Sequence, residues 1–144
     1  HMQHVMRTLD LPETDESIDA FVDEFFIGDE VDREIIDYIE SLCPRYKTVM
    51  LSNAWDNLRK ILINKWKIAD AFDEIFISAE MGFAKPDPKI YEMVLDKLDV
   101  APEETVFIDD FIENIEAACK LGMHGIHFQA PDVAMAELKA MLKE

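Results

Sequence analysis

The chain has 144 residues, of which 31 are Asp or Glu and 14 are Lys or Arg, so its formal net charge at pH 7 is −17. A charge of this sign and size repels nucleic-acid backbones and anionic membrane surfaces, which argues against both as partners. Apolar residues make up 49% of the chain, enough for the core of one globular domain. Because no apolar run is long enough to span a bilayer and no basic-then-apolar leader is present, we expect a cytoplasmic protein.

The cysteines and histidines form no metal-binding pattern. Cys43 and Cys119 lie far apart in the sequence, and both fall within helical apolar patterns. We interpret them as two reduced, buried thiols. His124 and His127 flank a predicted strand and are interpreted as structural residues.

Two helices are predicted in the first third of the chain. The first spans about residues 14–26, and Gly28 ends it. The second spans about residues 30–42, has an acidic first turn and is followed by Pro44. The apolar residues of the second helix that share one face are Val31, Ile35, Tyr38, Ile39 and Leu42.

From residue 47 onward, short apolar strands alternate with amphipathic helices. The predicted strands are residues 48–51, 74–77, 105–109 and 125–128. The first predicted helix follows residue 53, and the second begins at Pro88 after an Asp87 cap. The third spans about residues 112–121, and the fourth begins near residue 132. Residues 78–88 are predicted to form a loop. Four strand–helix units in succession imply parallel strands joined by helical crossovers, which is an α/β sandwich.

Polar residues follow three of these strands. Ser52 and Asn53 come after the first, Lys85 lies in the loop after the second, and Asp109 and Asp110 end the third. Because the carboxyl ends of parallel strands meet at one edge, we expect these five residues to share a site. A hydroxyl and a lysine suit phosphate oxygens, and two carboxylates suit Mg²⁺. Together they suit the stabilisation of a transferring phosphoryl group.

Each of these residues also has a plainer interpretation when it is taken alone. Ser52 and the Asp109–Asp110 pair are typical of helix caps, and Lys85 is typical of an exposed surface lysine. A covalent phosphoryl-transfer mechanism also needs a nucleophilic carboxylate and a second acidic group. None of the predicted strands supplies them.

Three stretches resemble motifs of the haloacid dehalogenase (HAD) superfamily, in its branch with a helical cap. Residues 49–53 (Val-Met-Leu-Ser-Asn) match the second motif, and residues 82–91 (Gly-Phe-Ala-Lys-Pro-Asp-Pro-Lys-Ile-Tyr) match the third. Residues 106–110 (Val-Phe-Ile-Asp-Asp) match the fourth, and the residues that follow also fit, with Asn114, Ala117, Ala118, Gly122 and Ile126. The three motifs occur in the family order.

This resemblance implies a HAD-type, Rossmann-like three-layer α/β sandwich with a parallel sheet. It also implies that the intact relative is a Mg²⁺-dependent phosphatase of a small phosphorylated metabolite. By the resemblance, Ser52 and Asn53 bind the phosphoryl group and Lys85 stabilises it. Asp110 touches Mg²⁺ directly, whereas Asp109 acts through water. A 2-haloacid dehalogenase-like hydrolase is the alternative activity, although that chemistry needs no metal.

The sequence departs from the family pattern at the first motif, an apolar strand followed by Asp-x-Asp-x-Thr, which carries the nucleophile and the acid/base. The 144 residues contain no such sequence. Asp10 and Thr14 have the family spacing, but Pro12 replaces the second aspartate, so we do not assign Asp10 as the nucleophile. Residues 1–45 instead resemble a helical cap remnant with the helix that leads into the core, and residues 46–144 resemble the Rossmann-like core. We therefore expect an incomplete, truncated fold without phosphatase turnover and with weak or absent Mg²⁺ binding.

The missing motif also bears on self-association. In the family, its strand lies between the strands that end here at Ser52 and Asp109, so its absence leaves two open sheet edges. Either these strands pair directly or a second copy fills the gap, and we expect the second outcome, a homodimer. The rival to an enzyme is a non-catalytic module that folds and self-associates. A phosphatase assay with Mg²⁺ separates the two interpretations.

Overall fold

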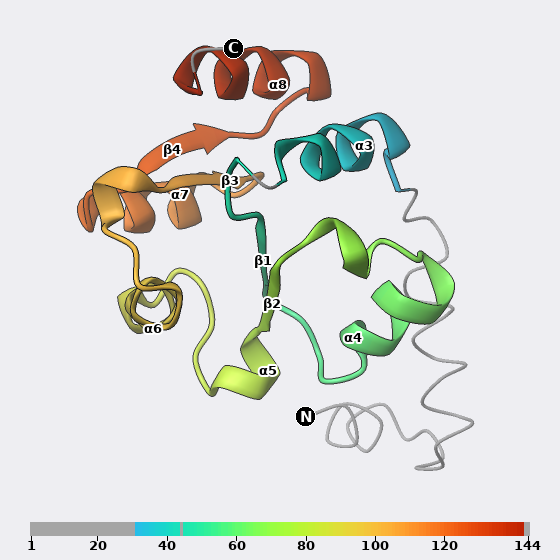
Figure 1. Cartoon of the computed structure of the whole chain (residues 1–144). Coiled ribbons are helices and arrows are strands. Elements are labelled where there is room, and N and C mark those ends of the chain that lie inside the picture. Colours follow the sequence, from blue (N-terminus) through green and yellow to red (C-terminus); the bar gives the residue numbers. More distant parts are fainter. Residues whose placement is uncertain (1–30, 44, 143–144) are drawn as a thin grey trace. The chain divides into compact units, whose positions relative to one another are not determined.

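The structure is a computed structural model that describes residues 31–43 and 45–142 (Figure 1). The predicted first helix, Gly28, Pro44 and Asp10 lie outside these residues. The chain divides between Glu80 and Met81 into two compact units, which are considered separately below. The predicted division between residues 45 and 46 stays a prediction.

The first unit begins, within the described residues, with α3 (Arg33–Leu42). The side chain of Asp32 caps this helix because it accepts hydrogen bonds from the main-chain N–H groups of Glu34 and Ile35. The predicted start near residue 30 is therefore wrong, since the cap fixes the first turn. The predicted apolar face omitted Ile36, which is buried together with Leu42.

Strands β1 (Val49–Ser52) and β2 (Glu74–Ile77) pair in parallel, with Ser52 opposite Ile77. They are connected through α4 (Leu58–Lys60), a π-helical turn η1 (Ile61–Lys65) and a 3₁₀ turn η2 (Ala69–Ala71). Several buried apolar side chains of this unit form one cluster, which comprises Ile36, Leu58, Leu62, Ile68, Ala71 and Ile77. The strand β2 has the predicted bounds, and β1 is shifted by one residue. Part of the predicted loop is helical, because α5 (Ser78–Met81) follows β2 directly.

The second unit contains α6 (Pro88–Leu98), a 3₁₀ turn η3 (Pro102–Glu104), β3 (Val106–Asp109), α7 (Ile112–Lys120), β4 (His124–His127) and α8 (Pro131–Met141). Asp87 caps α6 by accepting from the N–H of Lys89, and proline occupies the first turn, as predicted. Strands β3 and β4 pair in parallel, with Asp109 opposite His127. The largest buried side chains of this unit include Tyr91, Ile90 and Ile126.

The four strands form two separate two-stranded parallel sheets, β1–β2 and β3–β4. β1 belongs to the first unit and β3 to the second, so the predicted filling of the gap between these strands by a second copy stays a prediction. Both sheets show the alternation of parallel strands and helices that the sequence predicted, and the chain has an α/β fold. Among the described helices, none combines the length and the apolar character that crossing a membrane requires.

The interpretation of both cysteines as buried is wrong. Cys119 is exposed and Cys43 is half-buried. Cys119 lies on α7, whose buried residues are Asn114, Ile115 and Ala118. It directly follows Ala118 and therefore lies beside the buried face of the helix. Cys43 lies near the start of β1, with its Sγ atom 3.5 Å from Oγ1 of Thr48.

Candidate functional site

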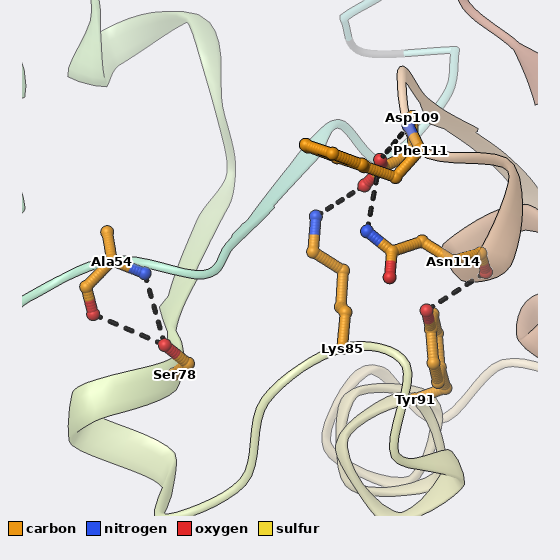
Figure 2. A network of polar contacts seen from close by, with 7 residues as sticks. All are labelled: Ala54, Ser78, Lys85, Tyr91, Asp109, Phe111 and Asn114. Carbon is orange, nitrogen blue, oxygen red and sulfur yellow. Dashed lines mark hydrogen bonds and ion pairs between the residues drawn. The ribbon is translucent and has the colours of Figure 1, made fainter.

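The centre of the candidate site is an ion pair inside the second unit (Figure 2). The ammonium of Lys85, in the loop before α6, donates to Oδ2 of Asp109 at the end of β3, at a distance of 2.5 Å. Both side chains are largely buried, with exposed fractions of 10% for Lys85 and 5% for Asp109. Water therefore screens this pair weakly, and the plainer interpretation of Lys85 as an exposed surface lysine does not hold.

The other carboxylate oxygen of Asp109 is bound as well. Oδ1 accepts from the main-chain N–H of Phe111 at 2.8 Å and from the side-chain amide of Asn114 at 3.1 Å. Burial on its own would raise the pKa of Asp109, but the hydrogen bonds from Lys85, Phe111 and Asn114 and the charge of Lys85 outweigh it and hold the pKa below its usual value. Asp109 is therefore an ionised carboxylate with a fixed orientation.

Tyr91 and Asn114 connect the helices that flank this ion pair. The hydroxyl of Tyr91, on α6, donates to the main-chain carbonyl of Asn114, on α7, at 2.9 Å in a buried position (Figure 2). Burial, together with the charge of Asp109, raises the pKa of Tyr91 to about 12, so the phenol stays protonated and remains a donor. The ring of Tyr91 also packs edge-on against Phe107 of β3. These contacts fix Asn114 where its amide reaches Asp109.

Asp110 differs from its neighbour. Its side chain is exposed, and no hydrogen bond of the described residues involves its carboxylate. Its main-chain carbonyl accepts from Nε2 of His127 at 3.0 Å. The two adjacent carboxylates therefore differ: that of Asp109 is buried, with hydrogen bonds to both oxygens, and that of Asp110 faces solvent.

Ser52 and Asn53 end β1 in the first unit, and the loop that follows them is held by Ser78. The hydroxyl of Ser78 accepts from the N–H of Ala54 at 3.1 Å and donates to the carbonyl of Ala54 at 3.2 Å (Figure 2). The N–H of Ala79 also lies 3.4 Å from this carbonyl. A single side chain therefore binds both polar groups of the residue after Asn53.

Replacing Ser78 by alanine is expected to lower the free energy of unfolding by about 1 kcal/mol, because the half-buried N–H of Ala54 loses its partner. Urea unfolding and hydrogen exchange of the Ala54 amide measure the change. Ser41→Ala is the matched control, since the hydroxyl of Ser41 donates only to the carbonyl of Tyr38 in an exposed position. Equal stability losses in the two variants, with unchanged exchange at Ala54, would contradict the assignment.

The structure thus joins two of the predicted site residues directly, Lys85 and Asp109, with Asp110 next in the chain. Ser52 and Asn53 belong to the other unit, and their place in the same site stays a prediction. Sequence reasoning noted Asn114 only as part of a motif and missed its contact with Asp109. A polar residue on the apolar face of α7, five residues after Asp109, was the available signal. Ser78 directly follows β2, so the reasoning that selected Ser52, a polar residue at the end of a strand, also applies to Ser78.

Comparisons with known proteins identify the family of the chain. The family model for haloacid dehalogenase-like hydrolases matches residues 1–122. The sesquiterpene phosphatase astK of Aspergillus oryzae is 42% identical over 73 residues, which are 51% of this chain and 37% of that protein. The D-ribitol-5-phosphate phosphatase of Bacteroides thetaiotaomicron is 31% identical over 99 residues, 65% of this chain and 48% of that protein. The chain therefore spans less than half the length of either relative.

Solved structures show the same fold. A predicted HAD-like family hydrolase from Porphyromonas gingivalis superposes with a TM-score of 0.81 at 26% identity, over 98% of this chain and 71% of that one. A HAD family enzyme from Bacteroides thetaiotaomicron, in complex with magnesium and inorganic phosphate, gives a TM-score of 0.75 at 28% identity, over 88% of this chain and 66% of that one. The fold is Rossmann-like, as the sequence predicted. This chain belongs to the haloacid dehalogenase-like hydrolase family.

Proposed function

We propose that this chain carries the phosphate- and cation-binding part of a Mg²⁺-dependent phosphatase that acts on a small phosphorylated metabolite. The observation that carries the proposal is the difference between the two adjacent carboxylates at the end of β3. Asp109 is buried and bound by Lys85, whereas Asp110 is exposed. Two of the similar proteins are phosphatases of small molecules, and one similar enzyme was crystallised with magnesium and phosphate, which supports this choice among hydrolases.

The donor set fits a magnesium ion of the kind that enzymes share with a phosphate. Mg²⁺ takes oxygen ligands and is usually held by one or two carboxylates, with water and substrate phosphate completing its shell. Asp110 is the candidate direct ligand. Asp109, whose two oxygens already accept three hydrogen bonds, suits contact through water. The described residues contain no group of three or more carboxylate, histidine or cysteine side chains that would hold a metal, so binding by this chain is expected to be weak.

The roles of the other residues follow from their chemistry and from the family resemblance. When bound, the ion would neutralise charge on a transferring phosphoryl group. Lys85 brings a fixed positive charge beside Asp109, and Ser52 and Asn53 offer hydroxyl and amide groups for phosphate oxygens. The 144 residues contain no Asp-x-Asp-x-Thr sequence, so we propose that this chain has no phosphatase turnover by itself. The homodimer and the cytoplasmic location also stay proposals, and sedimentation at micromolar concentration tests the first.

A titration of the ¹⁵N-labelled chain with Mg²⁺ and then inorganic phosphate tests the proposal. We expect the amide signals of Asp110 and Phe111 to shift, with half-saturation at roughly millimolar metal or above for so few ligands. Asp110→Asn should weaken binding by about tenfold or more. Asp132→Asn, which removes an exposed carboxylate from the first turn of α8, is the charge-matched control and should bind as before.

The same samples are assayed for hydrolysis of a generic aryl phosphate ester, and no turnover above buffer is expected. Signals near Asp110 that stay fixed at tens of millimolar Mg²⁺, a rough bound for weak sites, would overturn the cation site. Robust turnover that is lost in Asp10→Asn would overturn both the inactivity of the chain and the decision not to assign Asp10 as the nucleophile, whereas turnover that survives this change would point to contamination or to another nucleophile.

A further inference from the structure

His127 occupies the last position of β4, opposite Asp109 in the sheet register. Its ring nitrogen Nε2 lies 3.0 Å from the main-chain carbonyl oxygen of Asp110. A carbonyl oxygen only accepts hydrogen bonds, so Nε2 must carry the proton in this contact. The neutral imidazole is therefore the Nε2–H tautomer, with Nδ1 unprotonated.

This contact fixes one of the two peptide groups that flank the Cα atom of Asp110. The peptide after Asp110 is held at both ends, because its carbonyl accepts from His127 and its N–H, that of Phe111, donates to Oδ1 of Asp109 at 2.8 Å. The peptide before Asp110 is held by the N–H of Phe128, which donates to the carbonyl of Asp109 at 2.8 Å. The two peptide planes determine the backbone angles of Asp110 and hence the direction of its Cα–Cβ bond, from which the carboxylate extends.

We propose that His127 is a positioning residue for Asp110: its Nε2–H holds the Asp110–Phe111 peptide and so fixes the direction in which the exposed carboxylate is presented to a divalent cation. The inference rests on the proposed function for the cation and deepens it. An exposed carboxylate on a mobile backbone would lose conformational freedom when it binds the metal, and a backbone fixed in advance avoids that loss. The sequence analysis interpreted His127 as a structural residue, and this proposal gives that residue a specific role.

The chain contains a matched control on the same strand. His124, the first residue of β4, also places Nε2 3.0 Å from a main-chain carbonyl, that of Glu103. It lies opposite Val106 at the start of β3, whereas His127 lies opposite Asp109 at its end. The two histidines therefore make the same hydrogen bond at opposite ends of one strand pair, and only one of them contacts the Asp110 peptide.

The experiment compares His127→Phe, His127→Gln and His124→Phe in the full 144-residue chain, with urea unfolding to confirm that each is folded. Phenylalanine keeps a ring and removes the donor, while the glutamine amide nitrogen reaches the position of Nε2. Without metal, His127→Phe should speed hydrogen exchange of the Phe111 amide, and the other two variants should not. With Mg²⁺ as the probe, His127→Phe should weaken affinity about tenfold, the lower end for outer-shell partners of metal ligands. His127→Gln should restore most of it, and His124→Phe should leave it unchanged.

The outcomes separate the two proposals. Wild-type affinity in His127→Phe, or equal losses in His127→Phe and His124→Phe, would overturn the role of His127 and leave the cation site intact. A failure of glutamine to restore affinity would also overturn it, since the role assigned is that of a donor. A wild-type chain that does not respond to Mg²⁺ overturns the proposed function and, with it, the presentation of Asp110 to a cation. Finally, ¹⁵N NMR of the imidazole should show the Nε2–H tautomer, and the Nδ1–H tautomer would exclude the contact.

Discussion

Lys85→Met is expected to lower the free energy of unfolding by about 3–5 kcal/mol at neutral pH, the usual cost of removing one partner from a buried ion pair. Methionine keeps the packing of the lysine stem and removes the charge together with the hydrogen bond to Asp109. Asp109, with 5% of its side chain exposed, would then be an ionised carboxylate without its cation and with only the Phe111 and Asn114 donors to stabilise it. Equilibrium urea unfolding measures the loss.

The pH dependence of this loss follows from the pKa of Asp109. The folded chain holds that pKa below the value of an unfolded aspartate, so the charged group stabilises the fold at pH values above the unfolded pKa. This stabilisation is lost as the pH falls through the folded pKa. In Lys85→Met the hydrogen bond and the charge of Lys85 no longer lower the pKa of Asp109, while the hydrogen bonds from Phe111 and Asn114, which lower it, and burial, which raises it, remain. The difference in stability between wild type and variant should therefore be largest near neutral pH and narrow below about pH 4.

Lys89→Met is the control for the loss of one positive charge near the start of α6. Lys89 is exposed and its ammonium lies over the ring of Phe83, 5.1 Å from the ring centroid. Exposed contacts of this kind contribute about 1 kcal/mol or less. A similar loss in the two variants, or a gap between wild type and Lys85→Met that does not change with pH, would contradict the assignment of Lys85 and Asp109 as a buried pair.

The parts of the fold that could be predicted are those with strong local signals. The strand Glu74–Ile77 is short, apolar and bounded by polar residues, and its observed bounds are the predicted ones. The start of α6 was predicted because Asp87 and Pro88 form a cap and a first turn that need no tertiary contact. The expectation that Lys85 and Asp109 lie together followed from a rule of parallel sheets and is confirmed by their contact.

The rest depended on contacts between residues distant in the sequence. The π-helical turn Ile61–Lys65 follows α4 where the apolar pattern alone predicts a regular helix, and α5 occupies part of a predicted loop. The partners of Asp109 were harder still to predict, because the N–H of Phe111 carries no side-chain signature. Asn114 and Tyr91 are brought together by the packing of α6 and α7, which periodicity does not encode. Hydrophobic patterns predict which face is buried, but not which polar atom a buried group reaches.

Gly125 determines how closely α7 approaches β4. A Cβ atom at this position would lie 2.6 Å from Cγ2 of Ile115 and 2.7 Å from Sγ of Cys119, both on α7. Cys119 is exposed and its side chain is able to turn away. Ile115 is buried, with 6% of its surface exposed, and is stiff because it is branched at Cβ. An added methyl group would therefore have to displace α7, the helix whose Asn114 binds Asp109.

Gly125→Ala is accordingly expected to lower the free energy of unfolding by about 1–3 kcal/mol through overpacking, and to disturb the Asn114–Asp109 contact, seen as shifts of the Asn114 side-chain amide signals. Ile115→Ala removes the side chain that the new methyl group would contact. The stability loss of the double variant should therefore be smaller than the sum of the losses of the two single variants, by about 0.5–3 kcal/mol. Gly82→Ala is the control, because its Cβ would meet no atom of the described residues within 4 Å. Its cost of about 1–2 kcal/mol comes from the positive φ of 81°. That cost should add to the cost of Ile115→Ala without coupling. If the stability losses of Gly125→Ala and Ile115→Ala were additive, the close approach of α7 to β4 would not depend on Gly125.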